Sequence, residues 1–187
     1  MRFFRSHGVS PIGLLIEVVS IIFGVLIALG VNEVRQHYKQ QATVDIALKS
    51  ISNELTGNKQ FLEQRMPYYK AMRDTLNNII ARDGADARPG KIPGFNGINP
   101  PLLGKSSLQT AISTRAFSYM DFRKADYISR IYAFQDLYIN SVDKYMTAVI
   151  NNPNANIKQL RNTFGEMTIM GEELIGAYGT LLENLTE

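Results

Sequence analysis

The sequence PIGLLIEVVSIIFGVLIALGV, residues 11–31, is an apolar stretch with a single charged residue, Glu17. As an α-helix it extends about 31 Å, which matches the hydrocarbon core of a bilayer at roughly 30 Å. Fourteen of its residues are Leu, Ile, Val or Phe, and together they favour insertion by roughly 4–8 kcal/mol. One charged residue at the helix centre opposes insertion by only about 2.5–3.5 kcal/mol. We therefore predict a transmembrane helix over 11–31.

A cleaved signal peptide is the alternative interpretation, because Ala28-Leu29-Gly30 has the small-x-small form of a cleavage site. The apolar stretch is longer than the usual signal-peptide core of about 7–15 residues, which favours a retained span. Residues 1–10 carry Arg2 and Arg5 and no acid, so the positive-inside rule makes them a short cytoplasmic tail. The predicted location is a bacterial inner membrane, with the rest of the chain in the periplasm.

Five residues of the predicted span share one helical face, because they are spaced by 4, 3, 4 and 4 positions. They are Gly13, Glu17, Ser20, Gly24 and Ala28. The last three form a small-xxx-small pattern, which lets another helix approach closely. We predict a docking face for other transmembrane helices of a larger complex or for further copies of this chain. The alternative is that Glu17 only reaches interfacial water, since glycine and serine are common in spans.

Composition removes several classes of function. The 187 residues include no cysteine and only two histidines, His7 and His37, which flank the apolar stretch. Thiolate chemistry, multi-histidine metal sites and a Ser-His-Asp triad are therefore not expected. The net charge of +3 is too small and dispersed for a nucleic-acid surface. No phosphate-binding loop or metalloprotease motif occurs, so we expect neither a cofactor nor enzymatic activity.

Residues 32–82 predict one long helix that continues the span. Their apolar positions follow heptad-like steps of 3 and 4: Val44, Leu48, Ile51, Leu55, Leu62, Met66, Tyr69, Met72, Leu76 and Ile79. Asn58 occupies one position of this seam, where it either specifies register or faces water. Pro67 predicts a bend or the start of a second helix.

The segment 83–105, DGADARPGKIPGFNGINPPLLGK, is a loop rich in proline and glycine. Four of its apolar residues are candidates for pinning it to the helices: Phe95, Ile98, Leu102 and Leu103. We expect an ordered cover over the end of the helical body, with a ligand-gripping loop as the alternative.

Residues 106–187 supply the remaining helices. Ser106-Ser107 can cap a helix that reaches about Tyr119, and further helices follow over 121–151 and from Ile157 onward. The last one steps regularly by 3 and 4: Ile157, Leu160, Phe164, Met167, Gly171, Leu174, Tyr178, Leu181 and Leu185. This regularity demands a partner helix along its length, and Gly171 permits a close crossing. We predict an all-α chain whose C-terminal part is an antiparallel, extracytoplasmic helical bundle.

Four basic residues gather near the start of the 121–151 helix: Arg115, Arg123, Lys124 and Arg130. Pairing with Asp121 and Asp126, which lie among them, is the simpler interpretation of this cluster. A site for an anion is the other interpretation.

The stretch from Glu17 to Glu33, EVVSIIFGVLIALGVNE, resembles the signature of an uncharacterised family of small bacterial single-span membrane proteins. In that family an acid opens the span, a G-[VI]-L-I-A-L run follows, and Asn plus an acid or Trp closes it. A weaker similarity continues through 46–62 and 110–132, although Glu33-Val34 stands where many relatives have a nearby Trp. The resemblance implies a helical extracytoplasmic domain and no known activity.

Two functions fit these features. The first is a non-enzymatic accessory or structural subunit of a membrane complex, docked through the face that contains Glu17, with a bound lipid as a further partner. The second is a sensor-like bundle that binds a small ligand and signals through a membrane partner, by analogy with bacterial receptors.

Overall fold

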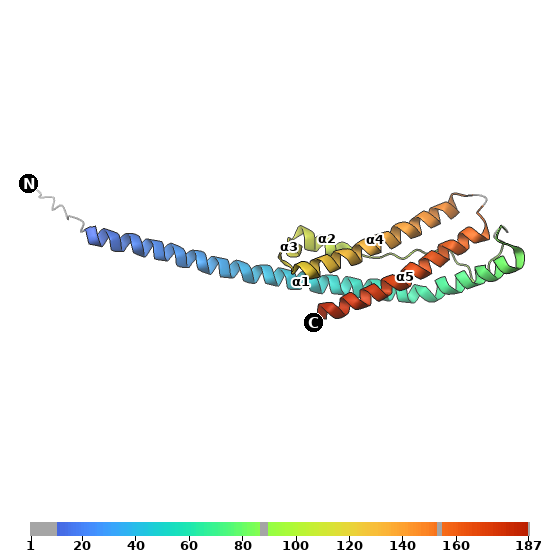
Figure 1. Ribbon diagram of the computed structural model, residues 1–187, viewed down its shortest axis with the longest axis horizontal. Helices are drawn as coiled ribbons and strands as arrows, with labels where there is room; N and C mark the ends of the chain where they lie inside the picture. Colours follow the sequence, from blue (N-terminus) through green and yellow to red (C-terminus); the bar gives the residue numbers. More distant parts are fainter. Residues whose placement is uncertain (1–10, 87–89, 153–154, 187) are drawn as a thin grey trace, which may run out of the picture. The chain divides into compact units, whose positions relative to one another are not determined.

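The computed structural model describes residues 11–86, 90–152 and 155–186 (Figure 1). Within these ranges all regular structure is helical, which confirms the all-α prediction. The helices are α1 Pro11–Asp83, α2 Ser106–Ser113, α3 Ala116–Tyr119, α4 Phe122–Ile150 and α5 Ile157–Thr186. The predicted cytoplasmic tail, residues 1–10, lies outside the described residues.

The chain divides into two units, Met1–Thr43 and Val44–Glu187. The described part of the first unit is a single stretch of α1. Its large apolar side chains are exposed from Ile12 through Val34, and none is buried within the chain. This stretch is long and apolar enough to cross a membrane by length and composition. Exposed apolar side chains on every face are what a lipid environment would accommodate.

The C-terminal unit, Val44–Glu187, has a core built by α1, α4 and α5. Fully buried side chains come from all three helices, among them Leu55 of α1, Ile128 of α4 and Phe164 of α5. Helices α4 and α5 lie side by side along most of their length (Figure 1). The regular pattern predicted for the last helix is confirmed, because its positions from Ile157 to Leu181 are buried.

Helix α1 passes through Pro67 without ending, so the alternative in which a second helix starts there is wrong. A proline inside a helix costs about 3 kcal/mol. Met66 and Tyr69, on either side of it, are both buried in the core, and this packing holds the helix together across the proline. The helix ends instead at Gly84, whose φ of +91° is the left-handed conformation typical of a helix C-terminus.

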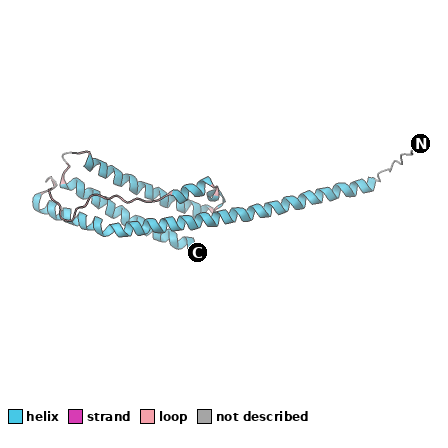
Figure 2. Cartoon of the chain, turned by 180° about the vertical axis from the view of Figure 1, so that it is seen from behind, coloured by secondary structure: helices cyan, strands magenta, loops and turns pink. Residues whose placement is uncertain are grey.

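The loop between α1 and α2 runs back along the helices instead of covering their end (Figure 2). We call its described residues 90–105 the strap. The Tyr69 hydroxyl donates to the Asn99 carbonyl at 2.7 Å, and the Tyr68 hydroxyl donates to the Gly97 carbonyl at 2.6 Å. The expected cover over the end of the body is therefore wrong.

The apolar pins of the strap also differ from those expected. Ile98 and Leu103 pack against the core as predicted. Phe95 is 41% exposed, but its ring packs edge-on against the buried ring of Phe164 with 6.3 Å between centroids, so it also pins the strap. Leu102 is 84% exposed and does not hold the strap down. Ile92 and Pro101, which are buried, are pins that the sequence did not single out. Two tyrosine hydroxyls on α1 thus set the path of the strap, which apolar residues alone did not predict.

The helix expected from Ser106 to Tyr119 is broken into α2 and α3 at Thr114 and Arg115. Arg115 adopts the left-handed conformation with φ of +60°, which an α-helix cannot continue. Neither serine caps α2: the residue before the first turn is Lys105, which makes no side-chain cap, and the Ser107 N–H is bonded by Glu54 of α1. Ser106 Oγ donates instead to Glu54 on α1. By contrast, the helix expected from residue 121 is confirmed, with Asp121 Oδ1 capping α4 by accepting two backbone N–H groups.

Candidate functional site

The predicted docking face lies on one uninterrupted stretch of α1. At about 100° per residue, its five members fall within an arc of about 80° on the helix surface. Glu17, Ser20, Gly24 and Ala28 are all exposed, and a Cβ added at Gly24 would meet nothing within 4 Å. Within the described residues no group of this chain bonds Glu17. Four of the predicted residues, Glu17, Ser20, Gly24 and Ala28, thus lie on one side of α1 and are exposed among the described residues.

A second group of polar side chains is buried in the C-terminal unit and centres on Gln135 of α4. Its Oε1 accepts from the Tyr178 hydroxyl at 2.6 Å and from Asn58 Nδ2 at 3.0 Å. Its Nε2 donates to the carbonyl of Gly104 at 3.0 Å. Asn58 closes the cluster with two bonds of 2.8 Å to the backbone of Gly104. This Gln135 cluster ties α1, α4 and α5 to the strap.

Glu54 of α1 forms a neighbouring centre. Its carboxylate accepts from the Tyr132 hydroxyl at 2.6 Å, from Ser106 Oγ at 2.8 Å and from the Ser107 N–H at 3.0 Å. Burial by itself would raise the pKa of Glu54, but these three donors outweigh it and hold the pKa below its ordinary value. Glu54 therefore stays ionised at neutral pH and fastens the start of α2 to α1.

Both clusters have the chemistry of structural ties. Among the described residues, no buried side-chain nitrogen or oxygen lacks a hydrogen-bond partner. A catalytic group needs access to a substrate, whereas each of these polar atoms is already engaged within the protein. Over the same residues, no three His, Asp or Glu side chains converge as metal ligands would.

An apolar groove lies between the strap and α4. It has a volume of about 450 Å³ and is lined by apolar side chains that include Ile92 and Phe95 of the strap, Met146 and Ile150 of α4, and Leu160 of α5. A smaller hollow of about 160 Å³ shares Met146 with it. The volume of the groove is within the range of small-molecule sites, so its size and apolar lining suit a small apolar ligand.

Comparison of the chain with protein-family models, curated proteins and solved structures found no match. The resemblance to a family of small single-span membrane proteins therefore stays an expectation.

The sequence did not identify the Gln135 and Glu54 clusters. The heptad pattern left two interpretations for Asn58, and the structure excludes the one in which it faces water, because Asn58 is 6% exposed and bonded to Gly104 and Gln135. A polar residue inside an apolar seam was thus the available signal. Its partners are 46 and 77 positions away, and no local pattern identifies such pairs.

Proposed function

We propose that this chain is a non-enzymatic accessory subunit of a membrane protein complex. It is anchored by residues 11–31 and docks through the face formed by Gly13, Glu17, Ser20, Gly24 and Ala28. The observation that carries the proposal is that this face combines small residues with an acid that has no partner within the described chain. A carboxyl group in a bilayer is costly and gains from a hydrogen-bond partner on another helix.

The topology of the proposal follows from charge and connectivity. Arg2 and Arg5 favour a cytoplasmic N-terminus in a bacterial inner membrane. The C-terminal unit, Val44–Glu187, is then an antiparallel periplasmic bundle that contacts the extracytoplasmic parts of the partner. Its hydrogen-bonded polar clusters support a rigid contact module, because they leave no reactive group of theirs free.

The experiment compares two glycine variants in native membranes. Gly24→Leu fills the docking face, and Gly30→Leu adds the same side chain about 120° away on the same helix. A Cβ meets nothing within 4 Å at either position, so neither change disturbs packing within the chain. After extraction in mild detergent, the mass and composition of the complex are measured. Gly24→Leu is expected to reduce the partner recovered at least tenfold, while Gly30→Leu retains it.

Glu17 provides an independent test of the same face. Glu17→Leu removes the hydrogen-bonding group and is expected to weaken association, whereas Glu17→Gln keeps a donor and acceptor and is expected to retain most of it. Equal recovery of the complex from wild type, Gly24→Leu and Glu17→Leu would refute the docking face. A purely homo-oligomeric particle would replace the accessory-subunit assignment with self-association through that face.

A sensor-like ligand-binding bundle is the second candidate, and the groove between the strap and α4 favours it. Residues 97 and 99 of the strap accept hydrogen bonds from Tyr68 and Tyr69 of α1. Its polar contacts with α4 lie at Gly104 and Lys105, whereas the groove between the strap and α4 is lined mainly by apolar side chains. The test is thermal unfolding of the detergent-solubilised chain with a panel of apolar and amphiphilic metabolites. Stabilisation that disappears in Met146→Lys, which places a charge in the groove, would support this function; no stabilisation by any compound would exclude it for that panel.

A further inference from the structure

Three side chains at the corner formed by α2, α3 and the start of α4 expose large apolar groups. Phe122 is 82% exposed, Ile112 is 56% exposed and Tyr119 is 44% exposed. They lie close together in sequence, on three consecutive helices. Large apolar side chains exposed this near one another in sequence are costly in water and favour an interaction surface.

Basic side chains accompany these apolar groups. Arg115, Arg123 and Lys124 have no ion pair within the described residues, whereas the nearby Arg130 is paired with Asp126 at 2.9 Å. Asp121 forms no ion pair with them, since its Oδ1 accepts the backbone N–H groups of residues 123 and 124, but its negative charge still offsets one of the three positive charges and leaves a net charge of +2. The simpler interpretation of the basic cluster, mutual pairing, therefore holds for Arg130 only.

The backbone at Arg115 is a second observation. Its φ of +60° is a conformation that glycine or asparagine adopts at lower cost. An arginine at this turn thus carries a conformational cost, which points to a use for its side chain beyond making the turn.

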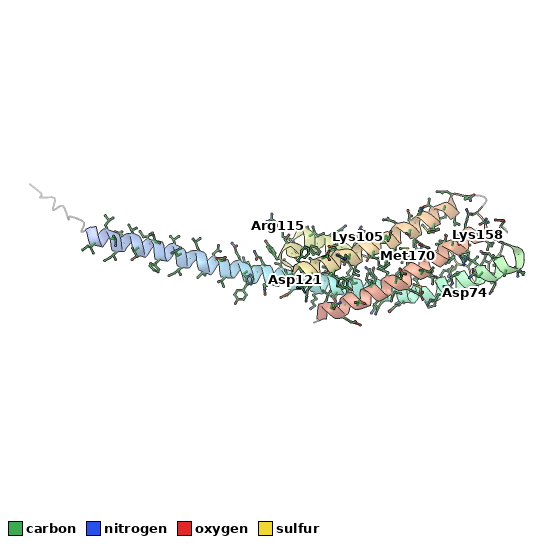
Figure 3. All side chains as sticks on the ribbon, in the orientation of Figure 1. Asp74, Lys105, Arg115, Asp121, Lys158 and Met170 are labelled. Carbon is green, nitrogen blue, oxygen red and sulfur yellow. The ribbon has the colours of Figure 1, made fainter. Side chains whose placement is uncertain are left out.

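The corner lies at the end of the C-terminal unit where α1 begins its packing. Ser107, at the start of α2, bonds Ser50 of α1 with an Oγ–Oγ distance of 3.0 Å. Arg115 and Asp121 lie at this end of the unit in Figure 3. Only the twelve residues 32–43 separate the apolar stretch from this unit in the sequence. The anchor keeps the corner at high effective concentration near a bilayer surface, so weak contacts suffice.

We propose that this corner patch, formed by Ile112, Tyr119 and Phe122 with Arg115, Arg123 and Lys124, binds the headgroup region of anionic phospholipids. Aromatic side chains favour the boundary between headgroups and acyl chains. Each Lys or Arg near an anionic surface contributes further attraction. A free anion would use the charges alone, whereas a lipid surface uses both the charges and the exposed apolar groups.

The experiment exploits the absence of tryptophan from the chain. Phe122→Trp introduces a single fluorescent indole into the full-length protein, reconstituted in nanodiscs of zwitterionic lipid with or without anionic lipid; we call this variant the patch reporter. Leu137→Trp is the matched control reporter, because Leu137 is also on α4 and 55% exposed. With anionic lipid, the emission of the patch reporter is expected to shift to shorter wavelength. Lipids brominated near the headgroup are expected to quench it, while the control reporter is unaffected.

The charge dependence is tested in the patch reporter with Arg115→Gly, Arg123→Gln and Lys124→Gln. Arg115→Gly relieves the strained backbone, so loss of contact cannot be attributed to unfolding if thermal stability is kept or raised. The ratio of lipid-bound to free patch is expected to fall about fivefold for each charge removed. Inorganic phosphate added to the discs is not expected to change the emission of the patch reporter. If phosphate shifts the emission as much as anionic lipid does, the patch binds a free anion and the proposal is overturned.

The proposal rests on membrane anchoring through residues 11–31, and the two fail differently. A chain that does not enter nanodiscs refutes the anchor. A chain that enters but leaves the indole of the patch reporter water-exposed and unquenched refutes the lipid contact alone. Equal quenching of the two reporters would also overturn it, because the whole unit would then adhere without a specific patch. The emission of the patch reporter could also shift without quenching by brominated lipid, and only in discs that hold two copies of the chain. That result would assign the patch to contact with a second copy and refute the lipid contact.

Discussion

Gln135 is fully buried where α1, α4, α5 and the strap meet, and its replacement tests how much that cluster contributes. Gln135→Met keeps a similar volume and removes both polar atoms. The Tyr178 hydroxyl then loses the acceptor it bonds at 2.6 Å. Asn58 Nδ2 keeps its bond to the Gly104 carbonyl, so the tyrosine hydroxyl is the group left without a partner.

The expected loss of stability follows from these contacts. A buried hydroxyl without a partner costs about 1–3 kcal/mol, and the lost bond to Gly104 adds about 1 kcal/mol. We predict that Gln135→Met lowers the free energy of unfolding by about 2–4 kcal/mol. Tyr178→Phe, which leaves Gln135 bonded to Asn58, is expected to cost about 0.5–1.5 kcal/mol. Because removing both partners leaves no orphaned hydroxyl, the double variant should cost at least about 1 kcal/mol less than the sum.

The assay is urea unfolding of the full-length chain in mild detergent, followed by far-ultraviolet circular dichroism. A lower midpoint at unchanged slope reports lost stability rather than a changed unfolded state. Gln109→Met is the control, because Gln109 is an exposed glutamine on α2, and it is expected to change stability by less than about 0.5 kcal/mol. Additivity of the two single variants within about 0.5 kcal/mol would refute the coupling.

Four further predictions concern single groups. Burial raises the pKa of Tyr132 and Tyr138, so stability should be complete below about pH 10 and fall as pH rises above it; an unchanged urea midpoint there would contradict this. The pKa of Glu54 in the folded chain lies below its ordinary value. Ionised Glu54 therefore stabilises the fold above the pKa that it has in the unfolded chain, and this stabilisation is lost as the pH falls through its pKa in the folded chain. Glu54→Gln should flatten the acid side of a plot of urea midpoint against pH, and curves of equal slope for variant and wild type would exclude that contribution. Gly176→Ala, with open space at the Cβ, should raise stability by about 0.5–1 kcal/mol, whereas Gly171→Leu should lower it, since even a Cβ comes within 2.7 Å of a neighbouring methyl; equal thermal midpoints would rule out this contrast. Asp121→Ala removes the α4 cap and should cost about 0.5–2 kcal/mol in urea unfolding; Asp121→Asn should restore most of it, and a silent alanine variant would show that the cap contributes nothing.

The helical character and the apolar stretch could both be predicted from the sequence, and so could the position of Glu17, Ser20, Gly24 and Ala28 on one side of α1, whereas docking through that side stays a prediction. Each depends on residues within a few turns of one helix: the length of an apolar run, or spacings of 3 and 4 that place side chains on one face. The pattern from Ile157 to Leu181 likewise predicted its own buried positions, because burial along a helix follows its period. Pro67 left open whether a second helix begins there. Helix α1 continues instead, because the burial of Met66 and Tyr69 in the core outweighs the tendency of proline to end a helix.

Only the tertiary structure decided how the polar residues and the strap are used. The strap follows Tyr68 and Tyr69, Asn58 joins Gln135, and Glu54 joins Tyr132 across separations of 29 to 78 positions. Hydrophobic burial is not directional, so an apolar pattern predicts which faces are covered and leaves open what covers them. Hydrogen bonds are directional and join particular atoms, and those pairings exist only once α1, α4 and α5 have packed.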